Sequence, residues 1–320
     1  MSRGAVLMVQ GTSSSAGKSF LVAGLCRLFS DAGLQVAPFK AQNMSNNAFV
    51  TVEGHEIGRA QAVQAHGARV IPHVDMNPVL LKPEADHRSQ VVLMGRPLAT
   101  LPAAAYQELK ERIWSEVLAA LDRLREQYDV VVVEGAGSPA EINLKARDIS
   151  NMRVALAANA PVLIVGDIDR GGVFAHLYGT HALLDPAEQA LVKGFIINRF
   201  RGDASLLEPA LTDIETMTGV PVVGVVPWIH DHGLPEEDAV ALERRPGGPV
   251  ETTTALDIAV VRFPRIANFD DFDPLEREPG VRLRYVEEAG GPEPDLVILP
   301  GTKATRADLD WLRGRGLDRW

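Results

Sequence analysis

The sequence of 320 residues contains a single cysteine, Cys26, and this excludes an intrachain disulfide. Cys26 shares one predicted helix face with Val22, Leu25 and Phe29, because the four residues are spaced at offsets 0, 3, 4 and 7. We therefore expect Cys26 to be buried in a hydrophobic core and not to act as a nucleophile.

Long hydrophobic runs and an excess of positive charge are also missing. No run approaches the ~18 apolar residues of a membrane-spanning helix, and the formal net charge of −10 argues against non-specific nucleic-acid binding. The short apolar run near the N-terminus leads into a loop and does not resemble a signal peptide. We expect a cytoplasmic protein with neither membrane nor nucleic acid as a partner, and the length suggests about two domains.

The sequence does contain a phosphate-binding loop near its start. An apolar run at residues 5–10 predicts a strand, a loop of small residues follows, and Gly17-Lys18-Ser19 opens a predicted helix at residues 18–32. Backbone N–H groups of such a loop surround phosphate oxygens, the lysine adds a positive charge, and the serine hydroxyl can bind Mg²⁺. The predicted nucleotide-binding residues are Gly11, Thr12, Ser13, Ser14, Ser15, Ala16, Gly17, Lys18 and Ser19. The spacing is a variant, since Thr12 stands where the common pattern has glycine.

The order of the remaining patterns predicts an α/β fold. Further strands are predicted at residues 35–39, 79–83, 89–94, 128–133, 161–165, 192–197 and 221–226, with helices at 57–68 and 103–127. The valines at 130–133 indicate a strand that is buried on both faces, as in a parallel sheet. We predict a doubly wound, mainly parallel sheet over residues 1–232, with the site at the carboxyl ends of its strands.

A second, smaller unit is predicted after a linker. Residues 233–250 are rich in Glu, Pro and Gly and read as the linker. Residues 251–320 contain three predicted strands, at 257–261, 281–286 and 295–299, and a helix at 307–313. This is an incomplete α/β unit with a thin core.

Polar residues follow several of the predicted strands in the first unit. Lys40 ends the strand at 35–39, and an amide-rich segment at 41–47 comes directly after it. This segment reads as a loop or, the reading that we favour, as a polar recognition segment at the carboxyl end of a strand, where ligands bind in open α/β sheets. Glu134 follows the valine strand, in the place of an acid that holds Mg²⁺ in phosphate-loop proteins. Asp167 follows the strand at 161–165, where it could bind substrate or metal or cap the next helix.

Eight segments taken together resemble one family. They are QGTSSSAGKS at 10–19, PFKAQNMSNN at 38–47, EIGRAQ at 56–61, MNPVLLKP at 76–83, VEGAGSPAE at 133–141, DIDRGGVF at 167–174, NRFRGD at 198–203 and RIANFDDFDPL at 265–275. With these segments the chain resembles the glutamine-hydrolysing cobyric acid synthases of cobalamin biosynthesis, over nearly its whole length.

The resemblance implies an ATP-dependent carbon–nitrogen ligase. The family converts four peripheral carboxylates (b, d, e and g) of adenosylcobyrinic acid a,c-diamide to amides through acyl phosphates, giving adenosylcobyric acid. Its synthetase domain is similar to dethiobiotin synthetase, and its C-terminal domain to class I glutaminases with a cysteine nucleophile. This chain has no cysteine after Cys26. We therefore expect an incomplete glutaminase half, and ammonia supplied free or by a separate glutaminase.

The resemblance also implies roles for particular residues, with ATP and Mg²⁺ as cofactors. Lys18 and Lys40 would stabilise the transferring phosphoryl group, and Asn198 would contact adenine. The implied metal ligands are Ser19, Glu134 and, by similarity to the dethiobiotin enzymes, Glu56. The implied contacts to the corrinoid are Gln42, Asn43, Asn46, Asn47 and Asp167. A homo-oligomer is compatible with the sequence, which leaves the oligomeric state open.

Three other functions remain open at this point. Cobyrinic acid a,c-diamide synthase performs the same chemistry at other carboxylates. A partitioning-type switch ATPase would carry a second lysine five places before Lys18, where this chain has Ser13. A remnant that only binds nucleotide is the third.

Overall fold

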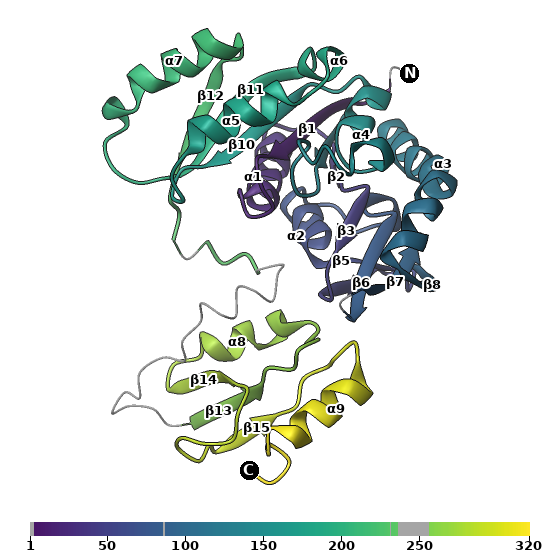
Figure 1. Ribbon diagram of the computed structural model, residues 1–320, viewed down its shortest axis with the longest axis vertical. Helices are drawn as coiled ribbons and strands as arrows, with labels where there is room; N and C mark the ends of the chain where they lie inside the picture. Colours follow the sequence, from purple (N-terminus) through teal and green to yellow (C-terminus); the bar gives the residue numbers. More distant parts are fainter. Residues whose placement is uncertain (1–2, 86, 231, 236–255) are drawn as a thin grey trace.

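The computed structural model describes residues 3–85, 87–230, 232–235 and 256–320. Most of the predicted linker at 233–250, and residues 251–255 of the predicted second unit, lie outside the described residues. The described chain forms two units, each built on its own parallel sheet, with the smaller one in green and yellow (Figure 1).

A six-stranded sheet forms the centre of the first unit, with the order β12-β11-β10-β1-β9-β2. Every neighbouring pair in it is parallel. Its strands are β1 (Ala5–Gly11), β2 (Val36–Phe39), β9 (Val130–Glu134), β10 (Val162–Asp167), β11 (Val192–Phe200) and β12 (Val222–Pro227). The parallel sheet predicted from the apolar runs is confirmed.

Helices cover both faces of this sheet, as expected of a doubly wound fold (Figure 1). Along β1, Met8 faces the larger hydrophobic core and Val9 the smaller one, since successive side chains of a strand point to opposite faces. The helix α3 packs Val117 into the larger core, and α1 packs Cys26 into the smaller one. The helices are α1 (Lys18–Asp31), α2 (Arg59–Gly67), α3 (Ala103–Gln127), α4 (Met152–Ala158), α5 (Val173–Ala182), α6 (Pro186–Gln189) and α7 (Glu208–Thr218), with short 3₁₀ turns η1 (Val74–Met76), η2 (Lys145–Arg147) and η3 (Ala204–Leu206).

A second, smaller sheet in the first unit contains the two strands predicted at 79–83 and 89–94 and two strands that were not predicted. It has the order β3-β6-β7-β8, with β3 parallel to β6 and the other neighbours antiparallel. Its strands are β3 (Gln42–Met44), β6 (Val79–Ala85), β7 (Arg88–Leu93) and β8 (Arg96–Pro102), and a hairpin of β4 (Ala48–Val50) and β5 (Glu56–Gly58) lies beside it. The segment at 41–47, read from the sequence as a loop or a polar recognition segment, contains β3, because β6 supplies a strand with which its backbone pairs.

The second unit is a three-stranded parallel sheet with the order β14-β13-β15. Its elements are β13 (Leu256–Val261), η5 (Phe269–Phe272), α8 (Asp273–Glu276), β14 (Val281–Val286), β15 (Leu296–Ile298) and α9 (Thr305–Gly314). Val261, Phe263 and Leu312 belong to a small core of its own, whereas Val297 on β15 is 41% exposed. A hydrogen bond from Lys303 Nζ to Gln90 Oε1 (2.6 Å) is one of its contacts with the first unit.

Candidate functional site

The phosphate-binding loop connects β1 to α1, as the sequence predicts. Gly17 precedes α1 with φ = +96°, a left-handed conformation that glycine adopts without strain. Asn198, at the carboxyl end of β11, donates from Nδ2 to the carbonyl of Ala16 (2.9 Å). A Cβ atom at Gly17 would lie 2.1 Å from that Nδ2. The structure therefore places Asn198 directly against the loop, where it supports the loop backbone.

Lys18 lies inside this loop and is 4% exposed. Its Nζ donates to the carbonyl oxygens of Ser13 (2.8 Å) and Ser14 (3.3 Å), and to that of Gly137 (2.8 Å) in the loop after β9. One ammonium group thus connects the two loops that follow neighbouring strands.

Glu134 lies at the centre of the site and is 1% exposed. Its Oε1 accepts hydrogen bonds from Ser19 Oγ (2.8 Å) and Lys40 Nζ (2.8 Å), and its Oε2 accepts one from Gln64 Nε2 (2.5 Å). β2 and β9 are neighbours in the sheet, so the sheet brings Lys40 and Glu134 together although they are far apart in the sequence. Sequence reasoning had selected Lys40, Ser19 and Glu134, and the structure places all three in one cluster.

The charge of Glu134 is maintained despite its burial. Burial alone would raise the pKa of this carboxyl, but the positive charge and hydrogen bond of Lys40, together with Gln64 and the charge of Lys18, outweigh that effect. The pKa of Glu134 is therefore below its ordinary value of 4.5, and the side chain is an ionised carboxylate at neutral pH.

Two residues of the site are not predicted by the sequence analysis. Gln64 on α2 contacts Glu134, and its own Oε1 is shielded from solvent without a hydrogen-bond partner in the part of the chain that the structure describes. Asn151 donates to the carbonyl of Ala136 and accepts from its N–H, both at 2.8 Å, so it fixes the loop after β9. No local motif marks either residue, since each acts on a loop that is distant in the sequence.

Ser19 and Glu134 fit a magnesium ion that arrives with a nucleotide. Mg²⁺ prefers oxygen ligands and commonly takes one or two carboxylates, phosphate oxygens and water. Ser19 Oγ and Glu134 Oε1 are 2.8 Å apart, and the unpartnered oxygen of Gln64 lies on a side chain that contacts the same carboxylate. Within the described ranges, no group of three His, Cys, Asp or Glu side chains could hold a metal by itself.

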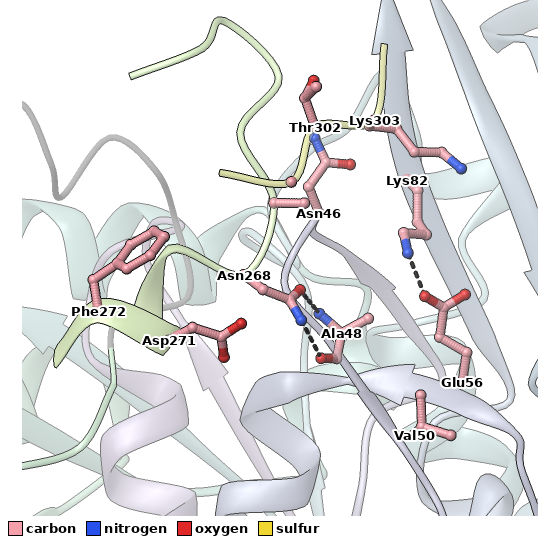
Figure 2. Close-up of a pocket in the computed structure, with 12 residues that line it drawn as sticks. Asn46, Ala48, Val50, Glu56, Lys82, Asn268, Asp271, Phe272, Thr302 and Lys303 are labelled. Atoms are coloured by element: carbon pink, nitrogen blue, oxygen red, sulfur yellow. Dashed lines mark hydrogen bonds and ion pairs between the residues drawn. The ribbon is translucent and has the colours of Figure 1, made fainter. Parts of the chain in front are cut away.

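Glu56, the third predicted metal ligand, lies elsewhere. It is on β5, forms an ion pair with Lys82 of β6, and lines a pocket between the two units (Figure 2). Among the contacts of the described residues, none joins Glu56 to Ser19 or Glu134. The structure therefore brings Ser19 and Glu134 together, and no contact among the described residues connects Glu56 to them.

The four predicted substrate amides fall into two groups. Asn43 and Asn47 are 3% and 1% exposed, and Asn43 donates from Nδ2 to Gln61 Oε1 (3.0 Å). Gln42 is half-buried and accepts a hydrogen bond from the Tyr106 hydroxyl (2.7 Å). Of the four, Asn46 lines the pocket between the units, whereas Gln42, Asn43 and Asn47 do not.

Asp167, the last residue of β10, connects the end of β11 with the segment after β10. It is 3% exposed, and its Oδ2 accepts a hydrogen bond from Arg199 (2.8 Å) while its Oδ1 accepts one from the backbone N–H of Asp169 (3.0 Å). Both oxygens thus have protein partners.

Comparison with known proteins agrees with this geometry. Residues 7–238 match the model of the CobQ/CobB/MinD/ParA nucleotide binding domain. The chain belongs to this family. Residues 257–320 match the CobB/CobQ-like glutamine amidotransferase domain, in agreement with the resemblance of the second unit to a glutaminase.

Several relatives of this chain are cobyric acid synthases. Cobyric acid synthase of Sorangium cellulosum is 60% identical over 318 residues, which are 97% of this chain and 60% of the relative. Cobyric acid synthase of Desulforudis audaxviator is 59% identical over 98% of this chain and 63% of the relative. The chain thus spans somewhat less than two thirds of the length of these relatives. MinD of Aquifex aeolicus has a TM-score of 0.39 and 14% identity over 71% of this chain and 84% of that one, a level from which we draw no conclusion.

Two further expectations concern Cys26 and membrane-spanning helices. Cys26 is fully buried, and burial, followed by the charge of Glu134, raises the pKa of its thiol to about 12. In the described part of the chain, no helix is long and apolar enough to cross a membrane.

Proposed function

We propose that this chain catalyses the ATP-dependent amidation of the b, d, e and g carboxylates of adenosylcobyrinic acid a,c-diamide. The observation that carries the proposal is the buried cluster of Lys40, Glu134 and Ser19 beside the phosphate loop. The cluster occurs in a chain that is 54–60% identical to cobyric acid synthases of several bacteria.

The chemistry requires activation, because a carboxylate has no useful leaving group for attack by ammonia. A carboxylate oxygen of the substrate attacks the γ-phosphorus of ATP, and ADP leaves. Ammonia then attacks the acyl carbon, phosphate leaves with a proton from the nitrogen, and the amide is formed. The contribution of the protein is chiefly positioning and stabilisation of charge.

The residues of the site divide this work. The loop from Gly11 to Ser19 holds the triphosphate, and the ammonium of Lys18 compensates the charge of its terminal oxygens. The Nζ of Lys40 lies 2.8 Å from Glu134, which holds it at the end of β9 beside the phosphate loop. Ser19 and Glu134 would hold Mg²⁺, which supplies positive charge against the phosphate oxygens when bound.

The ammonia for the amidation has to come from a source other than glutamine hydrolysis by these 320 residues. Residues 257–320 match a glutamine amidotransferase domain but contain no cysteine. Cys26 is a poor candidate nucleophile, because it is fully buried and the thiolate is the reactive form of cysteine. We propose that free ammonia or a glutaminase formed by other residues supplies the nitrogen.

The test is an assay of the 320-residue chain with ATP, Mg²⁺, ammonium and the a,c-diamide. We expect ADP release that depends on both corrinoid and ammonium, with the number of amides counted by mass spectrometry, and no turnover when glutamine replaces ammonium. Absence of corrinoid-dependent turnover with ammonium would contradict the proposal.

The same assay separates the alternatives. Turnover of cobyrinic acid, but not of the a,c-diamide, would indicate the a,c-diamide synthase. ATP hydrolysis that is indifferent to corrinoid and ammonium would indicate a switch ATPase. Ser13 disfavours the switch ATPase, because it stands where such proteins carry a second lysine.

A further inference from the structure

A pocket of about 380 Å³ lies between the two units (Figure 2). The first unit contributes residues of β4, β5 and β6 and the segment before β4. The second unit contributes residues near η5 and after β15. The lining residues that matter below are Asn46, Glu56, Lys82, Asp271, Phe272 and Lys303.

The two walls of this pocket are fixed to each other by specific contacts. The Asn268 side chain accepts a hydrogen bond from the N–H of Ala48 (3.0 Å) and donates one to its carbonyl (3.3 Å), as Figure 2 shows. Arg59 of α2 forms an ion pair with Asp270 at 2.7 Å. The pocket is therefore part of a defined interface between the units.

One acidic group of the pocket has no ionic partner. Asn46 lines the pocket as well, but its Oδ1 is shielded from solvent. Asp271 directs an exposed carboxylate into the pocket, and no described side chain forms an ion pair with it (Figure 2). A ligand that lies against this carboxylate can donate N–H groups to it.

Two donors in the pocket have hydrogens to spare. Lys82 pairs with Glu56, and Lys303 donates to Gln90 Oε1 (2.6 Å) and lies 3.7 Å from Glu84. An ammonium has three N–H groups, so each lysine can donate at least one further hydrogen bond. The fitting ligand therefore also accepts hydrogen bonds.

We infer that this pocket binds a primary carboxamide side arm of the corrinoid substrate, an inference that rests on the proposed function. A carboxylate arm would satisfy the lysines but meet Asp271 and Glu56, whereas a cationic arm would satisfy the acids but meet Lys82 and Lys303. A carboxamide is neutral and offers donors on its nitrogen and an acceptor on its oxygen. It alone of the three complements both sets of groups.

The size of the pocket agrees with a side arm and not with a whole macrocycle. Ligand pockets commonly measure about 300–1,000 Å³, and this one is near the lower limit. Ala48, Val50 and Phe272 supply apolar surface for the hydrocarbon part of an arm. Asn46 follows Lys40 by six positions, within about 20 Å of extended chain. One arm can therefore lie in the pocket while another part of the same ligand reaches the phosphate site.

The inference predicts a selectivity that the second unit controls. We would measure binding of cobyrinic acid, its a,c-diamide and cobyric acid to the 320-residue chain by equilibrium dialysis, following corrinoid absorbance. Asp271→Ala should weaken binding of the two amide-bearing corrinoids about ten-fold. Binding of cobyrinic acid and of an ATP analogue should stay within about two-fold of wild type. Asp271→Lys should reverse the order and favour cobyrinic acid, which a purely structural role of Asp271 would not produce.

The matched control is Asp310→Ala, which removes an exposed carboxylate of α9 that does not line the pocket. It should change no affinity. Unchanged a,c-diamide binding by Asp271→Ala, in a chain that still turns over corrinoid with ammonium, would overturn the pocket assignment and leave the proposed function standing. A wild-type chain that binds none of the three corrinoids would overturn both.

Discussion

Replacing Lys40 by methionine should leave Glu134 buried with a charge that lacks its ionic partner. Removing one member of a buried ion pair typically destabilises a protein by about 3–5 kcal/mol. Glu134 would retain its hydrogen bonds from Ser19 and Gln64, so we expect the lower end, about 3 kcal/mol. For a unit of this size that corresponds to a Tm lowered by roughly 6–12 °C.

The effect should depend on pH with a defined sign. In the wild type the pKa of Glu134 is below its ordinary value of 4.5. Its ionised form therefore stabilises the fold above about pH 4.5, and this contribution is lost as pH falls through the lower folded pKa. Without Lys40, burial becomes the dominant influence and raises the pKa of Glu134. The difference between wild type and variant should accordingly be largest at neutral pH and shrink on acidification.

Urea denaturation at several pH values between 4 and 8 would measure this difference, and the transition that ADP shifts identifies the first unit. Lys193→Met is the matched control, because Lys193 is exposed on β11 and donates only to the carbonyl of Ala190 among the described residues. It should alter the unfolding free energy by less than about 0.5 kcal/mol. A Lys40→Met chain within about 1 kcal/mol of wild type at pH 7 would refute the reasoning.

Other measurements address the rest of the site. Lys18→Ala should weaken nucleotide binding about 100-fold while the far-UV circular dichroism spectrum stays unchanged, because charge-assisted hydrogen bonds to phosphate are lost; unchanged affinity by calorimetry would contradict the assignment of the loop. Gln64→Leu should lower the stability of the first unit by about 1–2 kcal/mol in the same urea titration, since Glu134 Oε2 loses the donor identified here. Cys26 should not react with thiol reagents at pH 8 until urea unfolds the chain, given a thiol pKa of about 12; rapid reaction of the folded protein would show that the first helix opens. Amide hydrogens of residues 256–320 should exchange faster than those of the main sheet because the second core is small; equal protection by mass spectrometry would argue otherwise.

The main sheet could be predicted because parallel strands are buried on both faces and appear as apolar runs. Residues 130–133 are the clearest case, and Val131–Val133 are fully buried in the structure. In the smaller sheet, β6 and β7 correspond to the strands predicted at 79–83 and 89–94, whereas β3 and β8 were not predicted. The strand β3 consists of Gln42, Asn43 and Met44, and asparagine is rare in strands. The strand β8 contains Pro97 and Pro102, and proline normally argues against a strand.

The candidate site was predictable only as far as its parts were local. Lys18 and Ser19 stand in a recognisable loop, and Glu134 follows a recognisable strand. The contact of Lys40 with Glu134 depends on the order of strands in the sheet, which the sequence does not state. Gln64 was missed because nothing within α2 distinguishes it from the neighbouring Gln61.

The short helix α2 touches both units of the molecule. Arg59 at its first position pairs with Asp270 of the second unit, and Gln64, five positions later, donates to Glu134. Those positions are only about 7.5 Å apart along a helix axis. Thermodynamic linkage is reciprocal. If the Arg59–Asp270 contact changes the affinity for nucleotide by some factor, bound nucleotide changes the equilibrium constant for association of the units by the same factor. A nucleotide that binds more tightly when this contact is formed also holds the two units together more tightly, by the same factor.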